Sequence, residues 1–316
     1  MKILVRVLLA LFGLMVVLFL GLWIFIKVQF SDDSLTAQVN KTLKESLIRQ
    51  GSVKNVSVSL WPPVSLNIEG LTIANRPDSG FTQSKPMLDM KLLSARLDLF
   101  ALLQKKLTVE QITSESLYFL LETSEDGKSN LDELMQPSKP ETAEKKESGG
   151  FLDSLSFFFN RITVTNLIYE KIDHRGQSAL SASGIDLSLT GKTESGKALL
   201  NLDGNFVVKD LKFSNTFGTL VDGLQISGTQ TSVFDTEKGS WRFSKLEGKA
   251  GDLPLSVTGY MDSLYTPRRY MNLGITAPES DLKAVLGLLS KSLTKDVASA
   301  KTSGKLKFDM KIEGIL

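Results

Sequence analysis

A two-residue alternation of apolar and polar side chains recurs from residue 53 to the end of the chain and constrains the fold more than any other feature. At its start, Val56, Val58 and Leu60 alternate with Ser57 and Ser59. Successive side chains of a β-strand point to opposite faces, so this pattern is typical of strands with one apolar face. About thirteen such segments occur without regular strand–helix alternation, which predicts a mainly β fold with a largely antiparallel sheet.

The alternating apolar positions near the two ends of this region form the candidate binding surface. They are Val56, Val58, Leu60, Leu66, Ile68, Leu71, Ile73, Leu306, Phe308, Met310 and Ile312. The dipeptide Glu69-Gly70 changes the phase of the alternation, as a β-bulge would. In a compact sandwich the apolar face would close onto a second sheet, whereas in an open, curved sheet it would line a trough. The periodicity alone leaves both arrangements open.

The first thirty residues predict a membrane anchor. Between Arg6 and Lys27 lies an uncharged segment, residues 7–26, which as a helix would span roughly 30 Å of hydrocarbon. No small-residue cleavage pattern follows it, which favours an uncleaved anchor over a signal peptide. Because Lys2 and Arg6 precede the span and acidic residues soon follow it, we expect a cytoplasmic N-terminus and a body on the other side.

The charge of the remaining chain argues against a nucleic-acid partner. The sequence holds 37 Lys and Arg against 35 Asp and Glu. Residues 1–30 contribute three of the basic residues and no acidic one, so the rest of the chain carries 34 basic and 35 acidic residues. A body with a net charge of −1 offers no basic surface for a phosphate backbone.

The sequence contains no group of residues that points to catalysis. It has no Cys and one His, so the usual Cys-rich or His-rich metal site cannot form. It also has no nucleophile elbow and no glycine-rich nucleotide loop. We therefore expect no enzyme activity, catalytic residue, metal or cofactor. His174 is predicted to be an exposed turn residue, and the Asp-Gly pairs at 126–127, 203–204 and 222–223 are interpreted as turns.

Two helices are expected beside the strands. In the first, Leu35, Val39, Leu43 and Leu47 recur every four residues, residues 31–33 can cap the start, and Gly51 ends the pattern. The second begins at Ser280. Its apolar face would hold Leu282, Val285, Leu286, Leu289 and Leu293.

Composition divides the chain into four parts. Residues 136–150 combine Pro, Gly and charged residues with no large apolar side chain, so they cannot bury a core. We expect a membrane anchor at 1–30, a helix followed by a β-meander at 31–135, a disordered linker or loop at 136–150, and a second β-rich segment at 151–316.

Several motifs follow the predicted anchor in a fixed order. They are Ser59-Leu60-Trp61-Pro62-Pro63, Ala74-Asn75, Ser94-Ala95-Arg96-Leu97 and the stretch from Asp126 to Leu134. Together they resemble the AsmA family of periplasmic proteins anchored in the inner membrane. The last motif looks like the DGxxNW-type turn of that family, with Leu131 where an aromatic residue is common. The segment 306–312 is similar to the repeated C-terminal strands of these proteins.

The resemblance implies an N-terminal transmembrane helix followed by an elongated, curved antiparallel β-sheet groove, as in TamB and the chorein-type bridge proteins. It implies that phospholipids pass along the groove to support outer-membrane biogenesis. The chain would sit in the bacterial inner membrane through residues 7–26, with its body in the periplasm and envelope proteins as further partners. The alternative is a factor that influences outer-membrane protein targeting or assembly through protein contacts and binds no lipid. Because AsmA-type proteins commonly continue through further strands, we expect a truncated product.

Overall fold

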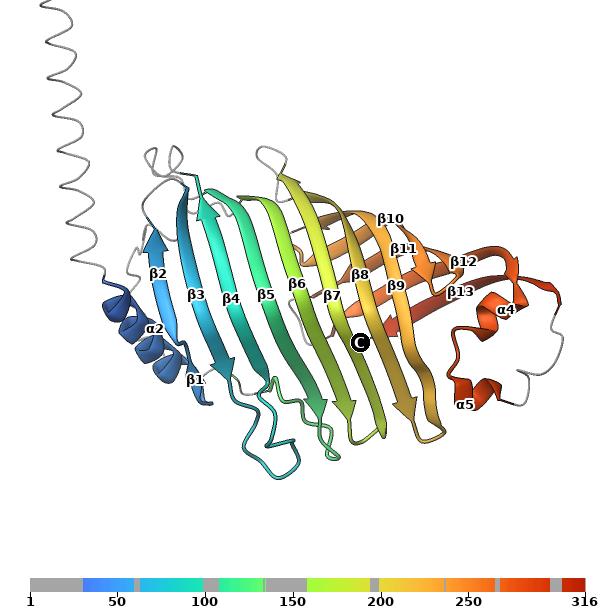
Figure 1. The fold of residues 1–316 in the computed structure, drawn as a ribbon, viewed down its shortest axis with the longest axis horizontal. Helices are drawn as coiled ribbons and strands as arrows, with labels where there is room; N and C mark the ends of the chain where they lie inside the picture. Colours follow the sequence, from blue (N-terminus) through green and yellow to red (C-terminus); the bar gives the residue numbers. More distant parts are fainter. Residues whose placement is uncertain are drawn as a thin grey trace, which may run out of the picture.

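The computed structural model describes residues 31–59, 63–98, 108–132, 134, 158–193, 199–235, 237–264, 268–295 and 303–315. These residues form one open sheet of thirteen strands, with helices α2, α4 and α5 beside it (Figure 1). The predicted mainly β, largely antiparallel fold is therefore confirmed, and the described strands belong to one sheet rather than to two packed sheets. The predicted span 7–26, the predicted linker 136–150 and Leu60 lie outside the described residues.

The strands lengthen towards the middle of the sheet. Their bounds are β1 (Gly51–Ser52), β2 (Asn55–Ser59), β3 (Val64–Ile73), β4 (Leu88–Leu97), β5 (Thr108–Thr123), β6 (Phe158–Asp173), β7 (Ser178–Thr193), β8 (Leu199–Asn215), β9 (Gly218–Asp235), β10 (Ser240–Ala250), β11 (Leu253–Asp262), β12 (Tyr270–Asp281) and β13 (Lys305–Ile315).

The strand order follows the chain from β3 to β13, and β1 and β2 both pair with β3. Every pair is antiparallel except β5 with β6, which run parallel over their whole lengths. This parallel ladder joins the two β-rich segments that the sequence places on either side of residues 136–150. The domain boundary itself remains a prediction.

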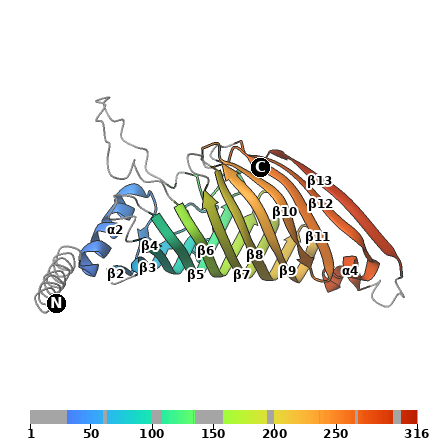
Figure 2. The same cartoon turned by 90° about the horizontal axis from the view of Figure 1, so that it is seen from above.

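The molecule is elongated in the direction in which its strands are stacked (Figure 1). Helix α2 (Asp32–Ser46) lies at the β1–β2 end, and α4 (Leu282–Leu286) and α5 (Lys291–Thr294) lie towards the β12–β13 end. Seen from above, the sheet is a curved and twisted layer (Figure 2). Within the described ranges, no helix is both long and apolar enough to cross a bilayer.

Helix α2 seals the edge of the sheet formed by β1 and β2. The side-chain amide of Asn40 donates to the carbonyl of Val53 at 3.0 Å, and its oxygen accepts from the N–H of Val53 at 2.8 Å. The hydroxyl oxygen of Thr36 accepts from the N–H of Val56 at 2.8 Å. These bonds satisfy backbone groups of an edge strand that a further strand would otherwise pair with.

One of the two predicted helices starts where the sequence predicts, and the other is interrupted. Helix α2 begins as expected, with the hydroxyl of Ser31 accepting from the N–H of Ser34. The second helix is interrupted between α4 and α5, where Ser290 is buried and bound to β9. The N–H of Ser290 donates to the carbonyl of Leu220 at 2.8 Å, and its hydroxyl donates to the carbonyl of Thr219 at 2.5 Å. These contacts place Ser290 at the start of a new helix.

A row of residues with left-handed backbone crosses the sheet from β3 to β9. Its members are Gly70, Ser116, Asn166, Gly184 and Gly223, with φ from +51° to +72°. In β3 the apolar alternation passes there from Leu66 and Ile68 to Leu71 and Ile73, because a left-handed residue interrupts the extended backbone. Gly70 has φ of +63°, so the backbone leaves the extended conformation at the position of the predicted phase change. The predicted bulge is wrong, since β3 pairs with β4 in one uninterrupted register.

Only one of the three Asp-Gly predictions is confirmed. Asp126-Gly127 lies in a turn, where the N–H of Gly127 donates to the carbonyl of Ser124. Gly204 instead lies inside β8, where an added Cβ would be 2.1 Å from a backbone oxygen of β7. Gly223 lies inside β9 with φ of +72°. Close strand approach and left-handed backbone therefore account for these two glycines.

Candidate functional site

An apolar row runs across the sheet from β2 to β13. Its members are Val58, Leu66, Ala95, Ile112, Ile162, Leu189, Gly204, Gln230, Leu246, Val257, Ile275 and Met310. Each residue is the register partner of the next, so the row occupies one face of the sheet. We call it the Val58–Met310 row. Only Gly204 and Gln230 interrupt its apolar character.

The opposite face carries a matching polar row. It consists of Ser57, Asn67, Ser94, Thr113, Thr163, Ser188, Asn205, Thr229, Glu247, Ser256, Thr276 and Asp309. Each member is the sequence neighbour of a member of the Val58–Met310 row, and successive side chains of a strand point to opposite faces. The sheet is thus amphipathic from β2 to β13 along these two rows.

A second row, apolar except at Ser114, Gly228 and Gly248, lies beside the first. It contains Val56, Ile68, Leu93, Ser114, Val164, Leu187, Phe206, Gly228, Gly248 and Leu255. Two glycines of this row are paired with each other, Gly228 in β9 and Gly248 in β10. An added Cβ at Gly248 would lie 2.1 Å from the carbonyl oxygen of Ser227. The two backbones therefore approach too closely for any side chain at this position.

The predicted site residues fall at both ends of these rows. Val58, Leu66 and Met310 belong to the Val58–Met310 row, and Val56 and Ile68 belong to the second row. Val56 is only 2% exposed, so it packs into the protein and presents little surface to a ligand. The remaining residues are paired as follows: Leu71 with Met90, Ile73 with Leu88, Leu306 with Ser280, Phe308 with Ala277, and Ile312 with Leu273.

The apolar face also contains one buried amide. Gln230 is 7% exposed and lies in the Val58–Met310 row between Gly204 and Leu246. Its side-chain nitrogen donates to the carbonyl of Leu202 at 3.4 Å, while its side-chain oxygen has no hydrogen-bond partner in the structure. A buried acceptor without a partner is costly, so this position departs from the otherwise apolar row.

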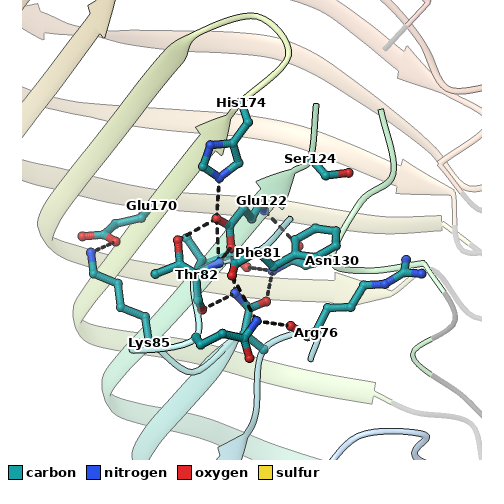
Figure 3. Close-up of polar contacts among 12 residues, drawn as sticks. Arg76, Phe81, Thr82, Lys85, Glu122, Ser124, Asn130, Glu170 and His174 are labelled. Carbon is teal, nitrogen blue, oxygen red and sulfur yellow. Dashed lines mark hydrogen bonds and ion pairs between the residues drawn. The ribbon is translucent and has the colours of Figure 1, made fainter. Parts of the chain in front are cut away.

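A buried polar cluster ties the loop after β3 to the end of β5 (Figure 3). Its centre is Glu122, whose side chain is 0% exposed. The carboxylate accepts hydrogen bonds from the N–H and hydroxyl of Thr82 and from the amide of Asn75 at 2.7 Å. The Nε2 atom of His174 lies 2.7 Å from the same carboxylate. Asn130 closes the cluster by donating to Asn75 at 3.0 Å and to the carbonyl of Leu120.

The surroundings of Glu122 control its ionisation. Burial by itself would raise the pKa of this carboxyl. The hydrogen bonds from His174, Thr82 and Asn75 outweigh burial, so the pKa of Glu122 is lowered. Glu122 is therefore held as a carboxylate whose lone pairs are occupied by neighbouring donors. Its contacts make it a structural junction between loops.

The cluster extends across the parallel ladder between β5 and β6. The phenol of Tyr118 donates to Glu170 at 2.7 Å. The ammonium of Lys85 lies 2.6 Å from the same carboxylate (Figure 3). Burial and the bond to Glu170 raise the pKa of Tyr118. The rings of Phe119 and Tyr169 stack with centroids 6.1 Å apart. These contacts reinforce the seam between the first five strands and the rest.

Sequence reasoning found the segments of this cluster but missed its centre. Asn75 and Asn130 lie within two of the motifs that resemble the AsmA family, and the structure places their amides in contact. His174 lies in an exposed turn, as predicted, but its bond to Glu122 was not expected. Glu122 lies near the end of β5, and nothing in its local sequence distinguishes it from a solvent-facing residue.

The described residues offer few side chains for a metal site or a charged-ligand site. Among the residues that the structure describes, no group of three or more His, Asp or Glu side chains could hold a metal ion. A surface pocket beside the Glu122 cluster is lined by residues that include Asp78, Thr82, Lys128 and His174. Its charged groups are largely paired, with Lys128 at 2.7 Å from Asp126 and Asp78 at 2.6 Å from Arg76.

The chain matches one family of known proteins. No curated protein and no solved structure matches the chain. A family model described as the AsmA family matches residues 1–220, which is more than half of the 316 residues. The matched region contains the predicted anchor and the motifs around Asn75 and Asn130. The protein is therefore a member of the AsmA family, whose proteins are associated with the cell envelope.

Proposed function

We propose that this protein binds phospholipids along the apolar face of its sheet and passes them from one end to the other, in support of outer-membrane biogenesis. The observation that carries the proposal is the Val58–Met310 row, which continues through twelve strands opposite an entirely polar row. Acyl chains gain free energy from leaving water for an apolar surface, at about 25 cal/mol per Å² buried. Head groups would remain in solvent at the rim of the sheet.

The length of the Val58–Met310 row suits movement of an acyl chain along it better than binding at a single position. Neighbouring strands are about 4.8 Å apart, so a row across twelve strands is roughly 50 Å long. An apolar row of this length offers successive equivalent positions to an acyl chain. At Gln230 an acyl chain would meet a buried polar side chain whose oxygen has no partner in the structure, so its free energy would rise locally there.

Membership of the AsmA family supports the cellular placement. In this proposal residues 7–26 cross the bacterial inner membrane once, the N-terminus is cytoplasmic and the sheet lies in the periplasm. Helix α2 follows the anchor directly, so the β1–β2 end of the sheet is the end closest to the source of lipid.

The proposal is tested by comparing adjacent residues on opposite faces. In the full chain, Val58→Asp combined with Ile68→Asp places two carboxylates among the apolar side chains, and we expect about a tenfold loss of co-purifying phospholipid. Bound lipid is measured by mass spectrometry of the detergent-extracted protein. A photo-reactive residue in place of Leu66 is expected to form lipid adducts.

The matched controls are Ser57→Asp combined with Asn67→Asp, and the photo-reactive residue in place of Asn67. These positions neighbour the test positions but belong to the polar row. The controls retain the same N-terminal segment, so lipid held around the anchor is equal in both sets. Equal lipid content in the two double variants, or adducts at residue 67 as frequent as at residue 66, would contradict the proposal.

Within the described residues β13 is the outermost strand of the sheet, and this edge supports a second candidate function. Leu306 is 40% exposed and Met310 is 44% exposed on this strand. An exposed edge strand can add a strand from a partner. The alternative is therefore an assembly factor that contacts envelope proteins through β13 and binds no lipid. Native mass spectrometry separates the two candidates, because a lipid-free complex of fixed stoichiometry favours the second.

A further inference from the structure

The hairpin between β8 and β9 presents an aromatic side chain to solvent. Asn215 pairs with Gly218, and the side-chain oxygen of Asn215 accepts from the N–H of Phe217 at 2.9 Å. Asn at the first position of a tight turn and Gly at the last are typical of this geometry. The turn therefore holds Phe217 at its tip, where the side chain is 84% exposed.

Helices α4 and α5 dock beside the same hairpin. Ser290 bonds to Thr219 and Leu220, which follow the tip directly in β9. Leu289 and Leu293 flank Ser290, and each is 43% exposed. Three large apolar side chains from two separate segments are thus exposed at one end of the molecule. We call Phe217, Leu289 and Leu293 the hairpin–helix patch.

Exposed lysines lie on the helices of the hairpin–helix patch. Residues 282–295 contain Lys283, Lys291 and Lys295, and this segment lies between Asp281 and Asp296 in the sequence. In β9, Asp222 pairs with Lys212 at 3.6 Å. All three lysines are exposed, and within the part of the chain that the structure describes no salt bridge involves them. Exposed leucines and an aromatic tip, with exposed lysines on the adjoining helices, are typical of surfaces that bind anionic bilayers.

We propose that the hairpin–helix patch docks onto the surface of an anionic phospholipid bilayer. Phe217 and Leu293 would enter the interfacial region, while Lys283 and Lys291 would contact the anionic head groups. β9, α4 and α5 lie far along the sheet from α2 (Figure 1). If residues 7–26 form the anchor of the proposed function, the docked bilayer is a second one, and this part of the proposal rests on that function. The proposal does not depend on lipid binding by the Val58–Met310 row.

The test uses the full chain in nanodiscs of phosphatidylcholine, mixed with separate vesicles of phosphatidylglycerol and phosphatidylethanolamine. The bound fraction is measured by vesicle flotation. We expect Phe217→Ser to lower vesicle partitioning about tenfold, because a large apolar side chain no longer enters the bilayer. We expect Lys291→Glu to lower it at least about fivefold, and added salt to weaken binding of the unaltered protein.

Ile315→Ser is the matched control, since Ile315 is 72% exposed but lies at the far end of β13 from the helices. Phe217→Trp adds a direct readout, in which its fluorescence is expected to be quenched by brominated lipid placed only in the vesicles. The proposal is overturned if the protein does not float with the anionic vesicles, or if Phe217→Ser and Ile315→Ser float equally. Flotation without quenching at residue 217 would assign binding to another surface and also overturn it.

Discussion

Glu122 illustrates how a single buried carboxylate can organise several loops. An isolated buried charge is costly, and here it is compensated by donors from Thr82 and Asn75 and by His174 in the turn after β6. Because the donors belong to separate segments, the loss of one group weakens the docking of each of the others.

The lowered pKa of Glu122 predicts how stability depends on pH. A carboxyl whose pKa is lower in the folded than in the unfolded protein stabilises the fold above its unfolded pKa, and this contribution is lost as the pH falls through the folded pKa. We expect Glu122→Gln to cost about 1–3 kcal/mol near neutral pH, with a smaller difference from the unaltered protein in acid. Chemical denaturation across the acidic range measures both. Glu125→Gln, at an exposed neighbouring position, should have little effect at any pH; a similar loss in both variants would argue against a special role of Glu122.

The glycines of the second apolar row predict a sharp difference between two alanine substitutions. At Gly248 an added Cβ would meet the carbonyl oxygen of Ser227 at 2.1 Å, so the backbone of β9 or β10 must move. We expect Gly248→Ala to lower the free energy of unfolding by about 1–3 kcal/mol. Gly314, in β13, has nothing within 4 Å of an added Cβ, and Gly314→Ala should be nearly neutral. Thermal unfolding of the two variants provides the measurement, and equal midpoints would contradict the expectation.

Strand glycines also show where sequence reasoning fails at the scale of a residue. Asp-Gly is a favoured turn, and this preference correctly predicts the turn at Gly127. The same dipeptide occurs inside β8 and β9, because Gly204 admits the backbone of β7 and Gly223 adopts a left-handed conformation. The requirement at Gly204 comes from a neighbouring strand, and the requirement at Gly223 comes from its own backbone conformation inside β9. The Asp-Gly dipeptide distinguishes neither case from a turn.

At the scale of elements, α2 acts as a substitute for a strand. Its side chains Thr36 and Asn40 bond to the backbone of Val53 and Val56 at the edge of the sheet. A helix that satisfies an edge in this way prevents pairing with another chain there. On the other side of the described sheet, β13 is the outermost strand.

Removal of one bidentate contact tests the role of α2. We expect Asn40→Ala to cost about 1–3 kcal/mol, because the N–H and carbonyl of Val53 both lose their partner at a part-buried position. The amide of Val53 should also exchange faster in hydrogen-exchange mass spectrometry. Lys41→Ala is the control, since Lys41 is 74% exposed and forms only a surface ion pair with Glu45. If both variants exchange and unfold alike, α2 does not protect this edge.

The spacing of apolar residues predicted an element correctly where that element simply places its apolar side chains on one face. The alternation at Val58 and Leu66 identified strands and faces, and the register confirms that these two residues share a face. The stripe from Leu282 to Leu293 predicted one continuous helix, but the helix is interrupted because Ser290 bonds to β9. Contacts between elements distant in sequence decide such breaks, so the pattern of a single segment cannot reveal them.

At the scale of the whole molecule, the proposed function requires the apolar face to be continuous. A charge in the middle of the sheet should therefore impede transfer without preventing binding at the β2 end. We expect Phe206→Asp to slow phospholipid transfer between vesicles about tenfold, since a carboxylate on an apolar path is costly to pass. Lipid adducts at residue 66 should persist. Asn205→Asp, at a member of the polar row, should transfer at the unaltered rate, and a slow Asn205→Asp variant would point to a general structural defect.

The parallel pairing of β5 with β6 has a consequence for how the molecule can be divided. Thr108–Thr123 and Phe158–Asp173 are held together by a backbone ladder, by Tyr118 and Lys85 on Glu170, and by His174 on Glu122. The peptide connection between these strands runs through residues 124–157, and its described residues, 124–132 and 134, are not part of this ladder. A backbone nick within residues 136–150 would therefore yield two polypeptides that remain one particle, a natural basis for split-protein complementation.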